Sequence, residues 1–145
     1  MLLSHCFNHC LTYTYKLPLH FVAKVKVIKE EKTSIMLVPE ISLTPQTVDR
    51  FIARFGEEKI AVLHSKLSIG ERYDQWQKIK SGKAKIIIGA RSAIFAPVKN
   101  LGIIIIDEEH DSSYKSEMTP RYNAKEIAEV LAKKNRIPLI LGSAT

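Results

Sequence analysis

The sequence predicts an α/β fold in which a parallel β-sheet carries helices on both faces. Short apolar runs alternate along the chain with amphipathic helical patterns, and the loops between them are short. The run at residues 101–106 (LGIIII) has no polar side chain, as expected of a strand that is covered on both faces. The length of 145 residues suits one domain with a substantial core.

The composition is that of an ordinary soluble domain, with 46% hydrophobic and 26% charged residues. No apolar run approaches the ~20 residues that a membrane span needs, and the N-terminal segment lacks the pattern of a signal peptide. With only two cysteines, the sequence predicts a cytoplasmic protein with no membrane partner. The net charge of +7 favours a polyanionic partner, with nucleic acid ahead of an anionic membrane.

Strands and helices are expected in alternation. The strands are the apolar runs at residues 34–38, 59–63, 84–88, 101–106 and 137–141. Residues 19–31 are expected to form the C-terminal part of the first helix, because apolar residues recur there at spacings of three and four. The second helix begins after an N-cap at Thr44, with Pro45 in its first turn, and stops at Gly56.

The two remaining helices also begin at capping residues. Ser68 and Glu71 form a capping box, in which each side chain satisfies a backbone amide near the other. This third helix ends at Gly82, and its larger apolar side chains are Tyr73, Trp76 and Ile79. The fourth helix opens at Asn123 and runs to about residue 135. The apolar residues expected on its inner face are Ile127, Val130 and Leu131.

Residues 1–18 show no clear period and form an unassigned N-terminal segment, so the expected domain spans residues 19–145. Two cysteines and two histidines lie close together there, at Cys6, Cys10, His5 and His9. Four such ligands within six residues cannot easily surround one tetrahedral zinc ion, and structural zinc sites usually draw ligand pairs from two segments. No zinc is therefore expected in this chain.

An acidic box follows the strand at residues 101–106 directly, and it contains Asp107, Glu108, Glu109, His110 and Asp111. In parallel sheets, the ligand crevice lies beyond the carboxyl ends of the strands. One carboxylate there can hold a Mg²⁺-bound water while its neighbour deprotonates an attacking water, as in nucleotide hydrolysis. The alternative is a solvated acidic surface loop. Polar groups that follow three other strands, at residues 39–40, 91–92 and 143–145, favour a functional site.

Five segments occur in a fixed order: LVPEISLTPQ (37–46), GARSAIFAP (89–97), DEEHDSSY (107–114), TPRYNA (119–124) and GSAT (142–145). Together they resemble the motifs of the replication-restart helicases, DExH enzymes of superfamily 2, over residues 19–145. The resemblance implies a RecA-like parallel sheet that is incomplete at the N-terminus. It also implies a fragment of an ATP-dependent 3′–5′ DNA helicase that acts in primosome assembly. ATP and Mg²⁺ would be the cofactors, and single-stranded or forked DNA and the primosome and replication-restart proteins the partners.

The resemblance also implies roles for individual residues. Asp107 matches the acid that holds Mg²⁺ through water, and Glu108 matches the general base for ATP hydrolysis. Glu109 and His110 complete the DExH box. The residues that match the segment coupling hydrolysis to movement are Gly142, Ser143, Ala144 and Thr145. The residues that fall in DNA-contacting motifs are Pro39, Glu40, Thr44, Arg91, Ser92, Tyr114 and Arg121, with Tyr122 in the same aromatic-rich loop.

One family motif is absent from the sequence. Family members carry a glycine-rich P-loop just before the helix expected at residues 19–31, but no GxxxxGK followed by Ser or Thr occurs here. Without that cradle the triphosphate loses its main anchor, so negligible ATPase is expected of this chain alone. A non-catalytic module that binds single-stranded nucleic acid is the alternative. A receiver-like signalling domain is less favoured. An RNA helicase of the same superfamily is also less favoured, because the sequences of segments 37–46 and 89–95 resemble the replication-restart helicases more closely.

Overall fold

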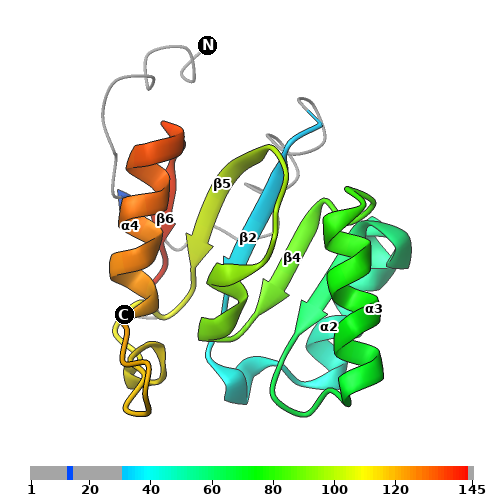
Figure 1. Ribbon diagram of the computed structural model, residues 1–145, viewed down its shortest axis with the longest axis horizontal. Coiled ribbons are helices and arrows are strands. Elements are labelled where there is room, and N and C mark those ends of the chain that lie inside the picture. Colours follow the sequence, from blue (N-terminus) through cyan, green and yellow to red (C-terminus); the bar gives the residue numbers. More distant parts are fainter. Residues whose placement is uncertain (1–12, 15–30, 144–145) are drawn as a thin grey trace.

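A computed structural model of the chain describes residues 13–14 and 31–143. These residues form a six-stranded sheet in the order β1-β6-β5-β2-β4-β3, and every neighbouring pair of strands is parallel (Figure 1). The strands are β1 (Tyr13–Thr14), β2 (Thr33–Leu37), β3 (Ile60–Leu63), β4 (Ile86–Gly89), β5 (Leu101–Ile106) and β6 (Leu139–Leu141). The expected parallel α/β sheet is confirmed, and β2 lies in its interior between β5 and β4.

Three α-helices connect the strands: α2 (Pro45–Phe55), α3 (Ile69–Lys80) and α4 (Ala124–Asn135). Their caps are those that the sequence predicts. The Thr44 hydroxyl accepts a hydrogen bond from the Thr47 amide at 3.2 Å, and the Asn123 side chain accepts one from the Lys125 amide at 3.0 Å. The capping box at the start of α3 is complete. The helix expected at residues 19–31 and the histidine–cysteine segment fall almost wholly outside the described residues.

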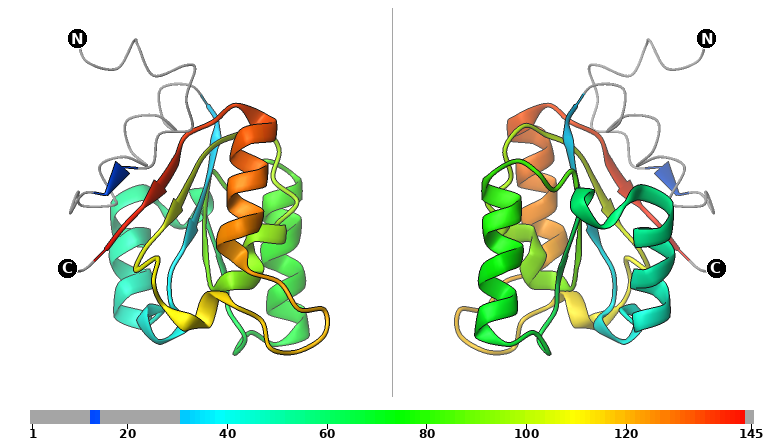
Figure 2. Two further views of the ribbon diagram at one scale, coloured as in Figure 1. Left: turned by 90° about the vertical axis from the view of Figure 1, so that its left-hand side faces the viewer. Right: turned by 90° about the vertical axis from the view of Figure 1, so that its right-hand side faces the viewer.

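The helices cover both faces of the sheet. Helices α3 and α4 lie on one face and α2 lies on the other (Figure 2). Because side chains alternate along a strand, neighbouring isoleucines of β5 enter different cores: Ile104 packs on the α3 and α4 side, and Ile105 on the α2 side. Both are almost completely buried. This double coverage explains why the strands read as continuous apolar runs.

Helix α4 packs differently from the sequence prediction. Val130 was expected inside but is 64% exposed. The residues that α4 buries are Ala124, Ala128 and Ala132, and Ile127 and Leu131 are only partly buried. The small alanine side chains allow the helix to approach the sheet closely, so the buried stripe is centred on them rather than on the larger residues.

Four 3₁₀ helices complete the described chain: η1 (Glu40–Ser42), η2 (Glu57–Lys59), η3 (Arg91–Phe95) and η4 (Ser112–Tyr114). Three of them, η1, η3 and η4, lie in segments that follow the carboxyl ends of β2, β4 and β5. Within the described part of the chain, no helix is both long enough and apolar enough to cross a membrane.

Candidate nucleotide and nucleic-acid site

The carboxyl ends of four strands lie side by side at one edge of the sheet. Leu37 of β2 is in register with Gly89 of β4 and with Ile106 of β5, and Ile106 is in register with Leu141 of β6. Backbone hydrogen bonds continue past these ends, from the Asp107 amide to the Leu37 carbonyl (2.9 Å) and from the Gly142 amide to the Ile106 carbonyl (2.7 Å). The motif segments that follow these strands therefore meet at one edge, as the sequence predicts.

Asp107 and Glu108 occupy a sharp turn at the end of β5. The Asp107 carboxylate is half-buried, and its Oδ1 accepts a hydrogen bond from the Glu108 amide at 3.0 Å. Glu108 is exposed and has a φ of 46°, in the left-handed region. That conformation costs an L-residue about 1–2 kcal/mol. Backbone strain of this kind concentrates at functional sites, where the surrounding structure holds it in place.

Glu109 has a different environment from its two neighbours. Its side chain is only 10% exposed, and its Oε2 lies 2.5 Å from Nζ of Lys125 in the first turn of α4. The exposed His110 places its Nε2 3.5 Å from the other oxygen of the same carboxylate. Glu109 thus links the box to α4, and Asp111 caps η4 by accepting a hydrogen bond from the Ser113 amide at 2.8 Å. Asp107 and Glu108 are the acids next to the end of β5. The Lys125 partner was missed by the sequence analysis, because nothing local to residue 125 identifies the contact.

Gly142 lies directly against the acidic box. A Cβ atom at this position would be 3.0 Å from Asp107 Oδ1 and 3.5 Å from the Ile106 carbonyl oxygen. The Glu109 amide also donates to the Gly142 carbonyl at 2.9 Å. The segment expected to couple hydrolysis to movement therefore begins in direct contact with the box. Ser143 is half-buried, and Ala144 and Thr145 fall outside the described residues.

Tyr114 requires a correction. The sequence analysis placed it among residues that contact DNA, but its side chain is buried and its ring cannot stack on a base. Its hydroxyl lies within hydrogen-bonding distance of two strand-end carbonyls, those of Leu37 (3.2 Å) and Asp107 (2.5 Å). Burial raises the pKa of Tyr114, and the negative charge of Asp107 raises it further. Tyr114 is thus a neutral donor that joins the ends of β2 and β5.

Arg91 binds the backbone on both sides of Tyr114 in the loop that follows the acidic box. Its Nη1 donates to the carbonyl oxygens of Ser113 (3.2 Å) and Lys115 (2.7 Å), which flank Tyr114 in sequence. The half-buried guanidinium therefore connects the end of β4 to the loop after the acidic box. The sequence resemblance implied a DNA contact for Arg91 and did not reveal this structural role.

The segment after β2 combines buried and exposed residues. Pro39 is almost completely buried, so the expectation that its side chain contacts DNA is wrong. Glu40 accepts hydrogen bonds from the Ser65 hydroxyl and from the Ser65 amide (3.2 Å). The hydroxyl hydrogen bond from Ser65 is the main reason that the pKa of Glu40 lies below its usual value. The members of the predicted DNA-contact set that are exposed are Glu40, Thr44, Ser92 and Arg121.

An aromatic pair joins the segment that contains Ser92 to the segment that contains Arg121. The rings of Phe95 and Tyr122 meet edge to face, with centroids 4.9 Å apart. Phe95 is 52% exposed, which leaves part of its ring accessible to solvent. The sequence analysis included Tyr122 but missed Phe95, although the phenylalanine stands within the GARSAIFAP segment.

The donor set at the end of β5 fits Mg²⁺ held through water. Among the described residues, no group of three or more His, Cys, Asp or Glu side chains could hold a metal ion directly. Mg²⁺ does not need such a cluster, because it keeps several waters and typically binds one or two carboxylates together with substrate phosphates. The half-buried Asp107 carboxylate at the strand end is placed where it could accept a hydrogen bond from a water bound to such an ion.

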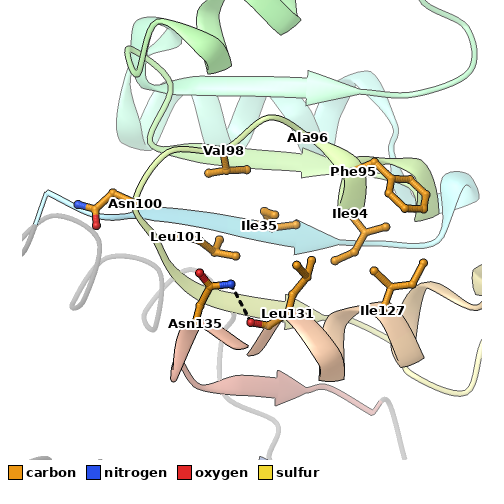
Figure 3. A pocket seen from close by; sticks show the side chains of 10 residues that line it. All are labelled: Ile35, Ile94, Phe95, Ala96, Val98, Asn100, Leu101, Ile127, Leu131 and Asn135. Carbon is orange, nitrogen blue, oxygen red and sulfur yellow. Dashed lines mark hydrogen bonds between the residues drawn. The ribbon is translucent and has the colours of Figure 1, made fainter. Parts of the chain in front are cut away.

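A separate apolar hollow of about 420 Å³ lies between α4 and the segment that follows η3 (Figure 3). Ile35 and Leu131 line it, and Asn100 and Asn135 stand near the start of β5. Asn135 donates to the Leu131 carbonyl at 2.9 Å. The hollow contains none of the acidic-box residues and extends to the amino end of β5, so it is not the expected nucleotide site.

Several solved structures have a similar fold. The C-terminal domain of Dbp5 from S. cerevisiae matches with a TM-score of 0.56 and 13% identity, over 78% of this chain and 61% of that one. The UvsW helicase from bacteriophage T4 matches with a TM-score of 0.53 and 17% identity, over 81% of this chain and 39% of that one. At these identities the likeness concerns the fold alone, and it confirms the expected RecA-like architecture.

Sequence comparison is more specific. The chain is 54% identical over 137 residues to the replication restart protein PriA of Bacillus subtilis (strain 168), and 58% identical over 112 residues to PriA of Synechocystis sp.. These matches cover 94% and 77% of this chain but only 17% and 13% of the relatives, so the chain spans a small part of their length. They confirm the resemblance to the replication-restart helicases. Residues 12–145 match the family model described as DEAD/DEAH box helicase, and the chain therefore belongs to the DEAD/DEAH box helicase family.

Proposed function

We propose that this domain is part of the ATP-hydrolysing motor of a DNA helicase that acts in replication restart. The observation that carries the proposal is the contact between the acidic box and the Gly142 turn at the carboxyl edge of the sheet. A change at either element would be transmitted to the other through two backbone hydrogen bonds. Translocation with 3′–5′ polarity, assembly with primosome proteins and a cytoplasmic location belong to the same proposal.

The chemistry follows from the positions of Asp107 and Glu108, the two acids next to the end of β5. Asp107 would hold Mg²⁺ through water, and the ion would neutralise charge on the phosphates. Glu108, which is exposed beside it, would orient the attacking water and accept its proton. Glu109 would act indirectly, because its ion pair with Lys125 fixes the box against α4.

DNA would run along the exposed residues of the same edge. Arg121 and the accessible ring of Phe95 offer a cation for phosphate and an aromatic face for a base. Arg91 and Tyr114 would connect this surface to the box through the loop between them. The net charge of +7 supports a polyanionic ligand, and it equally supports the second candidate, a non-catalytic single-strand-binding module.

The test of catalysis uses a relative that supplies the remaining parts. Residues 31–143 would replace the equivalent segment of the B. subtilis relative, and DNA-stimulated ATP hydrolysis would be measured. The chimera is expected to hydrolyse ATP, and Glu108→Gln to lower the rate by about 10²-fold or more, because the general base is lost. Glu126→Gln, which removes an exposed carboxylate from the first turn of α4, is the matched control and is expected to leave the rate unchanged.

Normal hydrolysis by the Glu108→Gln chimera would refute the assignment of the base. The isolated chain provides a second measurement. Since its sequence contains no P-loop motif, we expect negligible ATP hydrolysis from it with or without DNA. A DNA-stimulated rate that Glu108→Gln abolishes would show that the phosphates are held in another way.

A further inference from the structure

Helix α3 exposes a row of large side chains to solvent. Ile69 is 91% exposed, Tyr73 61% and Trp76 40%. With Arg72 and Lys80 they define the α3 stripe, whose members fall within about 100° of one another around the helix. A shallow hollow of about 410 Å³ lies along it. Contiguous exposed apolar side chains of this size on a soluble domain mark interaction sites.

Two residues of α3 define the face that it turns toward the sheet. Ile79 is almost completely buried in the core, and Gln75 Oε1 accepts a hydrogen bond from the Val62 amide at 3.0 Å. Tyr73 is 61% exposed and Trp76 40%, so both rings are accessible to solvent. At 100° per residue, Tyr73 lies about 120° around the helix from Ile79, and Trp76 lies about 60° from it, on the flank of the helix.

The charges on the α3 stripe have one sign. Arg72 and Lys80 line the hollow, and no carboxylate does. The two acids of the helix, Glu71 and Asp74, fall on other sides when positions are placed at 100° per residue. The Glu71 carboxylate is in addition engaged with the Ser68 amide at 2.8 Å. Aromatic faces between cations are suited to a ligand that has flat rings and a chain of negative charges.

The α3 stripe begins close to the proposed DNA edge. Helix α3 starts a few residues past the carboxyl end of β3 (Figure 2). In the intervening loop, the Ser65 amide and hydroxyl donate hydrogen bonds to Glu40 in η1, the 3₁₀ helix that follows β2. From Ile69 to Lys80 the helix rises about 16 Å, a length that a few nucleotides can follow. A strand that crosses the carboxyl edge of the sheet can therefore continue along α3.

We propose that the α3 stripe binds single-stranded nucleic acid, with bases stacked on Tyr73 and Trp76 and phosphates paired with Arg72 and Lys80. The inference rests on the proposed function, because its occupant is the DNA of that proposal, and it adds a binding surface outside the strand-end motifs. Stacking on an aromatic ring tolerates any base, so the stripe would bind without sequence preference.

The tryptophan provides a direct readout, because Trp76 is the only tryptophan in the sequence. The full chain would be titrated with an oligothymidylate at low salt while its fluorescence is recorded. We expect saturable quenching, since a stacked base quenches the indole. An abasic oligomer of the same length keeps the phosphates but has no bases, and it is expected to bind more weakly and without quenching.

Substitutions separate stacking from charge. Tyr73→Ala is expected to weaken binding of the oligothymidylate by about 10-fold. Val130→Ala removes an exposed apolar side chain from α4 on a different surface and is expected to have no effect. Arg72→Ala is expected to lower the slope of log affinity against log salt by about one, whereas Lys133→Ala in the last turn of α4 leaves the slope unchanged.

The outcomes are distinguishable. Binding without quenching, or equal affinity for Tyr73→Ala and Val130→Ala, would overturn this inference and leave the proposed function intact. A complete lack of oligonucleotide binding at low salt would overturn both this inference and the DNA contact of the proposed function. ATP hydrolysis by the chimera tests the catalytic part of the proposed function separately. Concentration-dependent self-association that Tyr73→Ala abolishes, with DNA affinity unchanged, would assign the stripe to a second copy of the chain instead.

Discussion

The buried hydroxyl of Tyr114 offers a sharp test of how the acidic box is held. Tyr114→Phe removes one oxygen atom and keeps the ring, so it creates almost no cavity. The Leu37 carbonyl keeps a partner, because it also accepts from the Asp107 amide at 2.9 Å. The Asp107 carbonyl loses the donor that lies 2.5 Å away. The perturbation is therefore confined to one hydrogen bond at the first residue of the box.

The expected loss of stability follows from that bond. A buried acceptor left without its donor costs about 1–3 kcal/mol, and partial burial of this one points to about 1–2 kcal/mol. With a urea dependence of about 2 kcal/mol per molar, the middle of the usual range, the unfolding midpoint should fall by roughly 0.5–1 M. The control is Tyr73→Phe, which makes the same chemical change on an exposed ring and should shift stability by less than about 0.5 kcal/mol. Equal midpoints for the two variants would refute the reasoning.

Alkaline pH gives an independent check of the same residue. Burial and the neighbouring Asp107 charge raise the pKa of Tyr114 above its unfolded value near 10. Above pH 10 the phenol of the unfolded chain loses its proton, whereas the buried phenol of the folded chain keeps it. The free energy of unfolding is therefore unaffected by this group below the unfolded pKa and decreases as the pH rises above about 10. The urea midpoint of the wild-type chain should therefore fall more steeply above pH 10 than that of Tyr114→Phe. Parallel curves would show that the phenol does not titrate differently in the two states.

Two further predictions concern the backbone of the site. Glu108→Gly and Glu108→Ala both remove the carboxylate, but only glycine adopts the left-handed φ without strain. The glycine variant should therefore be more stable than the alanine variant by about 1 kcal/mol in urea unfolding. Equal stability of the two variants would show that the turn carries no strain. Gly142→Ala places a Cβ 3.0 Å from Asp107 Oδ1, so it should lower stability and reduce ATP hydrolysis by the chimera. A Cβ atom at Gly70 would have no atom within 4 Å, so Gly70→Ala in α3 should instead raise stability by up to about 1 kcal/mol. Similar effects of Gly142→Ala and Gly70→Ala on stability would contradict the close approach at residue 142.

Local signals predicted most of the fold. The strands were found because a strand covered on both faces must be apolar throughout, as in the isoleucines of β5. The helix starts were found because Thr44, Ser68 and Asn123 supply hydrogen bonds to amides only a few residues away. The convergence of the motif segments followed from the parallel arrangement alone. Whether Asp107, Glu108 and the exposed members of the DNA set act as proposed stays a prediction.

The errors have a common physical origin, which is dependence on contacts between distant residues. Tyr114 is buried because two carbonyls at the ends of other strands accept from it, and its motif does not reveal this. Lys125 is important because Glu109 lies across from it in space. Val130 is exposed because the alanines of α4 determine which stripe of the helix faces the sheet. In each case the residue type was compatible with both outcomes.

The position of β2 in the middle of the sheet has a consequence for biosynthesis. Its neighbours β4 and β5 are both made later. Among the strands that the structure describes, β3 is the next to leave the ribosome, and it pairs with β4 and not with β2. The apolar β2 segment must therefore wait without a strand partner until β4 has been translated. Pairings between such distant segments slow folding and expose unpaired strands to aggregation, so a nascent chain of this topology should depend on chaperones more than a helical bundle of the same length.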